Sequence, residues 1–146
     1  MSQLLHVVFR VGETDYAVPA GEVAMMESWA GATPVPGAPR YVAGLVQVRG
    51  EVVPVVDMRV RFGLPPVEES LDTRVLVISD DQRKVGLKVD RAREVVRIDE
   101  ETLCDPPEEL ARTSARFVRA IAQTDDRLLM VIDGARVIGA EEELDG

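Results

Sequence analysis

Short runs in which hydrophobic and polar residues alternate recur along most of this chain, and β-branched residues are common in them. A period of two residues is typical of strands that bury one face. The pattern predicts about ten short strands, at residues 4–11, 16–20, 23–29, 45–49, 52–56, 74–79, 83–90, 93–98, 117–124 and 127–132. Strands that recur about every 8–12 residues indicate a barrel or a sandwich, so we expect a mainly all-β fold.

The run 23–29 is open to two interpretations, a strand or a helical turn. Its centre, AMMES, contains residues with good helix propensity, which favours the helical turn. The next segment, AGATPVPGAPR at residues 30–40, is rich in Pro, Gly and Ala and predicts an extended connector.

Short helices are expected at two places. Asp57 is a good N-cap for a helical turn at residues 58–62, which Gly63 would end. Asp133 is placed to cap a short C-terminal helix that runs through Leu144. The polar segment 99–114 predicts a loop with some helical turn. Further loops or turns are expected at residues 12–15, 64–73, 80–82 and 125–126.

The densest part of the pattern is GLVQVRGEVVPVVDMRVRFG, residues 44–63. Two β-branched runs flank Gly50-Glu51, and glycine at the first position of a two-residue loop predicts a type II′ hairpin. The expected pairs on one face are Arg49–Val52, Gln47–Pro54 and Leu45–Val56, and those on the other face are Val48–Val53 and Val46–Val55. The second face is wholly aliphatic, so we expect it in the core.

The first face of this hairpin has the character of a docking surface, because apolar groups surround an amide and one guanidinium. Pro54 cannot donate a ladder hydrogen bond, so its strand is expected at an edge or a bulge. Arg49 is the leading candidate, since an arginine framed by apolar groups can anchor an interface. The alternative is a solvated arginine at a hairpin tip.

Residues 44–63 also resemble the signature of CheW-type chemotaxis coupling proteins. That signature reads Gly-x-x-Asn-Leu-Arg-Gly, then an aliphatic run with Pro, then Asp-Leu-Arg. The residues that match it are Gly44, Arg49, Gly50, Pro54, Asp57 and Arg59. Gln47, Val48 and Met58 stand where the family usually has Asn, Leu and Leu. The similarity extends more weakly from about Leu5 to the C-terminal helix.

The resemblance implies a single CheW-like domain over residues 1–146. Its two intertwined subdomains would be small five-stranded SH3-like barrels packed on a shared core, with short helical turns and a short C-terminal helix. The strand count alone does not separate this arrangement from a single sandwich.

The function implied by the resemblance is that of a cytoplasmic, non-catalytic adaptor. It would couple the tip of a chemoreceptor to the regulatory domain of a two-component histidine kinase, in receptor arrays that are cytoplasmic or lie close to the membrane. In the family, a Glu is frequent at the position of Met25, in a segment used for receptor contact. This departure, with those at Gln47 and Val48, leaves an alternative: an accessory protein that binds receptors without coupling a kinase, or a coupler for a divergent receptor.

The candidate partner-binding residues come from the hairpin and from the segment around Met25. They are Gly44, Leu45, Gln47, Arg49, Gly50, Val52, Pro54, Val56, Val23, Met25 and Met26. For the two methionines, packing in the core is the alternative interpretation. Trp29 is expected either to anchor an interface or to cover the mouth of a barrel.

Composition narrows the class of partner. The chain has 146 residues, enough for one compact unit with a real core. Its net charge of −9 and aromatic content of 4% disfavour nucleic acid as a partner. No apolar run approaches the roughly 18 residues of a membrane span, and no signal peptide is evident, so we expect no direct membrane insertion.

Catalytic chemistry is not expected. His6 is the only histidine and is predicted to lie at the surface or rim, and Cys104 stands alone in an acidic loop that disfavours its thiolate. Phosphate-binding glycine loops are missing from the sequence, and the acidic pairs lack EF-hand spacing, so we expect no metal and no cofactor. The alternative from another class is a small barrel that holds a metabolite in its mouth, although no convergent polar groups mark such a pocket.

Overall fold

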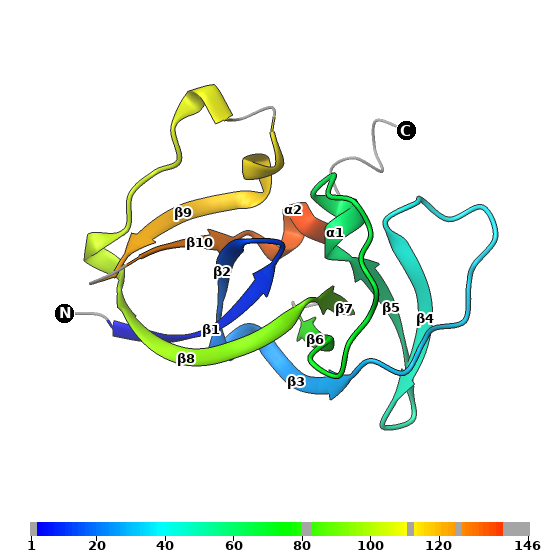
Figure 1. Ribbon diagram of the computed structural model, residues 1–146. Helices are drawn as coiled ribbons and strands as arrows, with labels where there is room; N and C mark the ends of the chain where they lie inside the picture. Colours follow the sequence, from blue (N-terminus) through cyan, green and yellow to red (C-terminus); the bar gives the residue numbers. More distant parts are fainter. Residues whose placement is uncertain (1–2, 80–82, 111–112, 125–126, 139–146) are drawn as a thin grey trace.

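The computed structural model describes residues 3–79, 83–110, 113–124 and 127–138, which form two five-stranded sheets (Figure 1). The first sheet contains β1 (Gln3–Val11), β2 (Thr14–Pro19), β8 (Arg91–Asp99), β9 (Val118–Gln123) and β10 (Leu128–Ile132), in the order β8-β1-β2-β10-β9. The second contains β3 (Val23–Ser28), β4 (Val42–Val48), β5 (Glu51–Asp57), β6 (Arg74–Ser79) and β7 (Lys84–Val89), in the order β3-β6-β7-β5-β4. The predicted mainly all-β fold is confirmed.

The two sheets are interleaved along the chain. The first two strands belong to the first sheet, the next five to the second, and the last three return to the first. The 3-10 turn η1 (Ala20–Glu22) makes the first crossing. At the second crossing Asp90 alone separates β7 from β8, so this one residue belongs to the junction of both sheets.

Both sheets contribute to one shared core. Phe9 and Tyr16 of the first sheet stack with ring centroids 5.8 Å apart, and the contacts continue from Tyr16 to Phe62 at 4.8 Å and from Phe62 to Phe117 at 5.6 Å. The same buried cluster includes Leu87 of the second sheet. Two smaller clusters lie within the individual sheets, one around Val8 and Leu129 and the other around Val53 and Val77.

Both short helices begin where their N-cap residues predicted. The Asp57 carboxylate accepts hydrogen bonds from the backbone N–H groups of Arg59 and Val60 at the start of α1 (Met58–Arg61). Asp133 caps α2 (Gly134–Ile138) in the same way. The part of the C-terminal helix expected beyond Ile138 and the turns expected at 80–82 and 125–126 lie outside the described residues. The loop predicted at 99–114, with some helical turn, contains the 3-10 turns η2 (Glu100–Thr102) and η3 (Glu108–Leu110), and a third turn, η4 (Ser114–Phe117), extends beyond it to the start of β9.

The favoured helical turn at residues 23–29 is wrong, because this segment is strand β3. It pairs antiparallel with β6, from Val23 opposite Ile78 to Ser28 opposite Arg74. Pairing with a neighbouring strand therefore overrides the helix propensity of AMMES.

The predicted surface position of His6 is also wrong. Its side chain is fully buried, and Nδ1 lies 3.0 Å from the carbonyl oxygen of Leu4. The cause is the place of β1, which separates the shared core on the side of Phe9 from the smaller cluster on the side of Val8. A strand buried on both faces does not follow a simple inside–outside alternation.

Candidate partner-binding site

The β4–β5 hairpin has the loop Arg49-Gly50, not the predicted Gly50-Glu51. Val48 pairs with Glu51, which leaves two residues in the loop. Both have positive φ, 50° at Arg49 and 84° at Gly50. Positive φ at both central positions is the signature of a type I′ turn, whose twist matches that of the strands.

This correction moves the register by two residues and so leaves the faces unchanged. Leu45 pairs with Pro54 instead of Val56, and Gln47 pairs with Val52 instead of Pro54. Side chains alternate between faces with a period of two, so an even shift keeps each residue on its predicted side. The aliphatic face is accordingly in the core, as predicted: Val53 and Val55 are buried, and Val46 packs against the same cluster.

The opposite face carries most of the predicted surface residues. Val52 is 67% exposed, Gln47 is exposed, and Leu45 and Pro54 are half-buried. Val56 shares this face by alternation, but the prediction that it lies at the surface is wrong. It is buried in the shared core, because residues of the first sheet such as Phe9 belong to the same cluster at this end of β5.

Pro54 does not lie on an edge strand, which was one of the two predicted places, but it lies next to the other, because the β4–β5 register shifts between Val42 and Gly44, opposite Val55 and Val56. β5 stands between β7 and β4, and its pairing with β7 begins only at Val55. On the β4 side, Leu45 opposite Pro54 exchanges its two backbone hydrogen bonds with Thr33 of the connector, both at 2.8 Å. The Leu45–Pro54 pair is therefore a non-hydrogen-bonded pair of the ladder, where a missing N–H costs no bond to β4.

Gly44 and Gly50 have conformational reasons to be glycine. At Gly44 a Cβ atom would lie 2.3 Å from the carbonyl oxygen of Thr33, and φ is 145°. The close approach of the connector to β4 therefore requires a residue without a side chain here. Gly50 provides the second positive φ of the loop.

Asp57 and Arg59 also serve the fold. Asp57 caps α1, as described above. The Arg59 guanidinium donates to both carboxylate oxygens of Asp90 at 2.8–3.1 Å and to the carbonyl oxygen of Pro65 at 2.7 Å. Asp90 also accepts a hydrogen bond from the backbone N–H of Gly12 at 2.8 Å, so this network ties α1 to the β1–β2 turn.

Arg49 differs from the other matched residues of the signature. Its side chain is exposed, and its guanidinium has no hydrogen-bond or ion-pair partner within the part of the chain that the structure describes. Among those residues it is also the one non-glycine with a positive φ. The left-handed conformation is unfavourable for an L residue by about 1–2 kcal/mol, so Arg49 holds a strained backbone without an internal contact that explains it.

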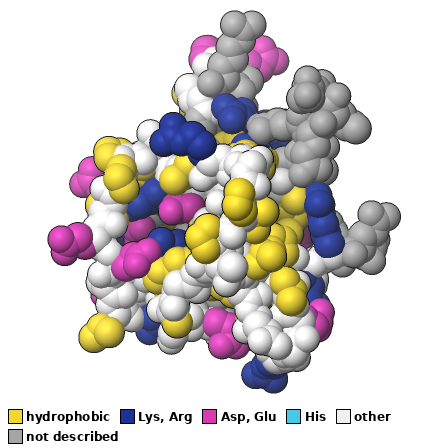
Figure 2. Space-filling view, turned by 90° about the vertical axis from the view of Figure 1, so that its right-hand side faces the viewer, with side chains coloured by type: hydrophobic (Ala, Val, Ile, Leu, Met, Phe, Trp, Pro, Cys, Tyr) yellow, Lys and Arg dark blue, Asp and Glu magenta, His cyan; other side chains and the backbone are white. Residues whose placement is uncertain are grey.

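A groove of about 580 Å³ lies beside the hairpin, between the end of β3 and β4. Residues 27–33 and 45–48 line it together with Val75. Figure 2 views the molecule from the side of the connector and the hairpin, and hydrophobic side chains gather over the middle of this face with charged ones at its margins. The connector was predicted as an extended segment, but its place as a wall of this groove depends on the Thr33–Leu45 bridge, for which the sequence offers no local signal.

The three candidates on β3 do not form one surface. Met26 is 45% exposed, whereas Met25 packs against the small cluster of the second sheet. Val23 lies at the far end of the strand and packs against the shared core. Met26 therefore lies at the surface, whereas Met25 and Val23 pack against the core.

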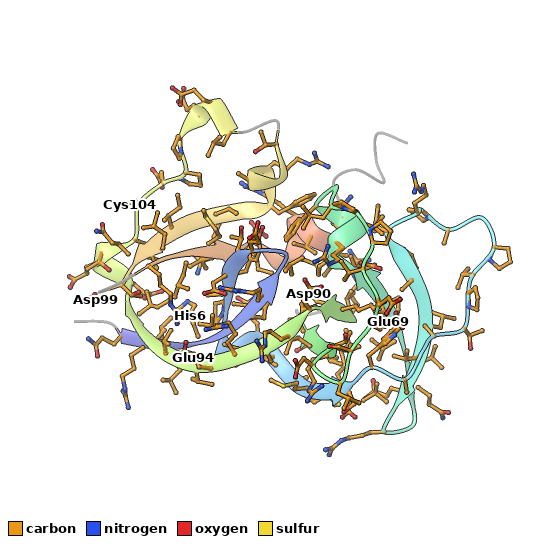
Figure 3. The ribbon with its side chains drawn as sticks, in the orientation of Figure 1. His6, Glu69, Asp90, Glu94, Asp99 and Cys104 are labelled. Carbon is orange, nitrogen blue, oxygen red and sulfur yellow. The ribbon has the colours of Figure 1, made fainter. Side chains whose placement is uncertain are left out.

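Trp29 connects the groove with a charged cluster. Its ring lines the groove, and the Lys88 Nζ lies 4.3 Å from the ring centroid. Lys88 pairs with Glu69 and with Asp57, 3.8 Å away. Hydrogen bonding to Lys88 is the main cause of the lowered pKa of Glu69. In Figure 3, Glu69 and Asp90 lie on the side of α1 and β7, whereas Cys104 and Asp99 lie at the opposite end.

Within the described residues, no group of three His, Cys, Asp or Glu side chains is arranged to hold a metal ion. Cys104 is exposed, and His6 is enclosed in the first sheet. No helix in the described part of the chain is long and apolar enough to cross a membrane.

Comparisons with known proteins agree with the geometry. A family model described as the CheW-like domain matches residues 5–142. The chain is 33% identical to the chemotaxis protein CheW of Bacillus subtilis over 92% of this chain and 86% of that protein. It is 32% identical to the chemotaxis protein CheW of Helicobacter pylori over 88% of this chain and 78% of that protein. The crystal structure of the scaffolding protein TtCheW from Thermoanaerobacter tengcongensis matches with a TM-score of 0.82 and 32% identity, over 91% of this chain and 86% of that one. The expected pair of SH3-like five-stranded units is thereby confirmed.

Proposed function

This chain belongs to the CheW-like domain family, and on that premise we propose that it is a non-catalytic adaptor of a bacterial chemosensory system. It binds the cytoplasmic tip of a chemoreceptor and the regulatory domain of a histidine kinase, and so makes kinase activity depend on receptor state. An adaptor of this kind acts only through the difference between its contacts in the two receptor states.

The observation that carries this proposal is the state of Arg49. Four of the other five matched residues, Gly44, Gly50, Asp57 and Arg59, have roles within the fold. Arg49 has an exposed guanidinium on a strained backbone and no internal partner in the described chain. Strain without an internal compensation is typical of residues kept for recognition.

The surroundings of Arg49 suit a protein partner better than a small ligand. Val52 beside the tip is 67% exposed, and Leu45 on the same face borders the groove. Apolar contacts around an arginine exclude water and strengthen its forked hydrogen bonds. Small-molecule sites are usually enclosed and contain convergent polar groups, whereas this groove opens along a strand.

A paired titration tests the proposal. The protein is titrated separately with a receptor-tip fragment and with a kinase regulatory domain from its own genome. Trp29 is the single tryptophan and lines the groove, so its fluorescence reports binding there when the partner lacks tryptophan. We expect both partners to bind, and Arg49→Glu to weaken at least one of them tenfold or more, about 1.4 kcal/mol.

The matched control is Arg97→Glu, which makes the same charge change at an exposed residue of β8. Both variants are surface changes and are expected to alter the free energy of unfolding by no more than about 0.5 kcal/mol. Equal loss of binding in the two variants would show a general charge effect. Binding of neither partner by the wild-type protein would overturn the adaptor role.

One observation favours the accessory alternative. Met25, at the position where the family often has Glu, packs against the apolar cluster of Val53 and Val77. A residue adapted to packing has no charge to offer a partner. Autophosphorylation of the kinase in the presence of receptor tips separates the two functions, because an adaptor stimulates it and an accessory protein that binds receptors alone does not.

A further inference from the structure

The groove beside the hairpin is also the open seam of the second sheet. In the order β3-β6-β7-β5-β4 the terminal strands are β3 and β4, and both line this groove, through residues 27–28 and 45–48 (Figure 1). Within the described chain one residue pair bridges the seam, because Thr33 of the connector and Leu45 of β4 exchange two backbone hydrogen bonds. A barrel that closes fully has no free edge, so the groove of about 580 Å³ leaves parts of both edges unpaired.

The seam opens at Gly31. Thr33 and Leu45 are antiparallel, so a ladder that continued along the connector would place Gly31 opposite Gln47. Gly31 instead has a positive φ of 94°, and no backbone hydrogen bond joins it to Gln47. The connector therefore leaves β4 after a single bridge, and the groove occupies the place of the missing pair.

Gln47 directs both of its backbone hydrogen-bonding groups toward this open edge. Leu45–Pro54 is a non-hydrogen-bonded pair, and Gln47–Val52, two residues further along the ladder, is of the same kind. The N–H and C=O of Gln47 therefore point away from β5, and they have no partner in the part of the chain that the structure describes. Such groups on an edge strand are a template for an added strand.

β3 presents the same kind of edge from the opposite wall. The backbone N–H of Trp29 donates to the carbonyl oxygen of Thr73 at 3.4 Å. The neighbouring pair, Ser28–Arg74, is therefore non-hydrogen-bonded, and Ser28 directs its N–H and C=O away from β6. Because Ser28 lines the groove, both walls of the seam offer backbone donors and acceptors.

The side chains around the seam define the chemistry of the segment that fits. Val46, Val48 and Trp29 line the groove and contribute to the small apolar cluster of the second sheet. Glu27 is the one charged residue of the described lining, is half-buried, and has no ion-pair partner among the described residues. Side chains of a strand alternate between faces, so a matching segment has apolar residues at every second position and a Lys or Arg that reaches Glu27.

We propose that the seam binds an extended segment of a protein partner, which enters between β3 and β4 as an added strand. The segment pairs with Gln47 in the antiparallel direction that the Thr33 bridge already has. Its backbone supplies the hydrogen bonds, and its alternating apolar side chains and one cation supply the specificity. This inference rests on the proposed adaptor function, because the segment belongs to a partner of that function.

Hydrogen exchange of single backbone amides tests this mode of binding. The protein is measured free and then saturated with whichever of the receptor-tip fragment and the kinase regulatory domain binds it. We expect the Gln47 amide to exchange readily in the free protein and at least tenfold more slowly in the complex. The Val48 amide, in a hydrogen-bonded pair with Glu51, is the internal control and is expected to exchange slowly in both states.

Two variants of Gln47 separate its backbone from its side chain. Gln47→Pro removes the N–H without removing a bond to β5, as Pro54 does on the facing strand. We expect it to weaken partner binding at least tenfold. Gln47→Ala keeps the N–H and is expected to retain the affinity within about threefold. If Gln47→Pro melts at a much lower temperature than Gln47→Ala, the exchange measurement decides.

Two results would overturn the added strand: a complex in which the Gln47 amide exchanges as fast as in the free protein, or equal weakening by the two variants. Either result leaves the adaptor function standing, since the partner still binds. If neither partner binds, the adaptor function fails, and a heptapeptide with valine at alternate positions and lysine at both ends tests the seam alone at millimolar concentration. Slower exchange of the Gln47 amide with this peptide supports the seam, and unchanged exchange overturns it.

Discussion

Arg49 adopts a backbone conformation that glycine and asparagine adopt more readily. Its φ of 50° precedes the φ of 84° at Gly50, which is the pattern that Asn-Gly satisfies best in two-residue hairpin loops. The arginine side chain therefore destabilises the folded hairpin relative to asparagine at the same position. Natural proteins retain such residues where function needs the side chain.

The change Arg49→Asn separates stability from function at this residue. We expect the free energy of unfolding to rise by about 1 kcal/mol, because the left-handed strain is relieved, while affinity for the partner falls. Urea unfolding and the partner titration measure the two effects. A variant with unchanged or lower stability would show that the backbone of Arg49 is not strained.

At the scale of elements, the hairpin presents adjacent residues to opposite environments. Val52 is 67% exposed and Val53 is 2% exposed, although both are valines of β5. Val53→Asp would bury an unpaired carboxylate among Val55, Val75 and Val77, and we expect it to destabilise the fold by about 3 kcal/mol or more. Val52→Asp is the matched control, expected to retain stability within about 0.5 kcal/mol and to weaken partner binding.

Thermal unfolding followed by circular dichroism checks this pair. Equal destabilisation by the two substitutions would contradict the assigned faces of the hairpin. The contrast is informative because the register differs from the predicted one by two residues and yet keeps the same faces.

Elements with local signals could be predicted from the sequence, and elements decided by distant contacts could not. The caps Asp57 and Asp133 satisfy nearby N–H groups, so both helix starts were predictable. β3 is a strand because β6 lies beside it, which its own residues do not indicate. The loop at Arg49 is a case of the same kind, since arginine has no preference for positive φ.

The candidate site follows the same division. The signature pointed to Arg49, and the alternation of residues within two strands predicted the mixed face that contains Leu45 and Val52. The sequence missed features that depend on tertiary contacts: the Thr33 bridge that builds the groove wall, and the shared core that buries Val56.

At the scale of the whole molecule, Glu22 lies where the chain crosses between the sheets. Desolvation by burial raises its pKa above the ordinary value of 4.5, and Asp133 adds to the rise, whereas Arg119 and His6 act against it. A raised pKa means that folding favours the protonated form. The associated stability is present below the unfolded pKa and is lost as the pH rises through the folded pKa.

Glu22→Gln tests this linkage, because glutamine stays neutral at every pH. We expect the variant to be more stable than the wild-type protein at pH 7, the difference to shrink as the pH falls through the raised pKa of the folded state, and no charge-dependent difference to remain below the ordinary pKa of 4.5. Urea unfolding at a series of pH values measures it. A difference that is constant with pH would assign the effect to packing instead of charge.

Asp90 joins the two sheets more directly than any cap or crossing turn described above. It is the single residue between β7 and β8, and its carboxylate accepts hydrogen bonds from Gly12 in the β1–β2 turn and from Arg59 in α1, which follows β5. Its backbone N–H donates to the carbonyl oxygen of Arg10 at 3.0 Å. The shared aromatic core and this junction together support the proposal that residues 1–146 fold as one domain.

If so, the two sheets unfold together. Trp29 fluorescence reports on the second sheet and far-ultraviolet circular dichroism on both, and we expect coincident midpoints in urea. Asp90→Asn removes the charged acceptor of a half-buried ion pair. We expect it to lower the free energy of unfolding by about 2 kcal/mol and to shift the fluorescence and circular dichroism midpoints to the same lower urea concentration.

Asp72→Asn, at an exposed acid 3.7 Å from Arg91, is the control and should change the free energy of unfolding by no more than about 0.5 kcal/mol. Midpoints that separate in either protein would mean that each sheet folds by itself, since a change at a true junction cannot affect one side alone.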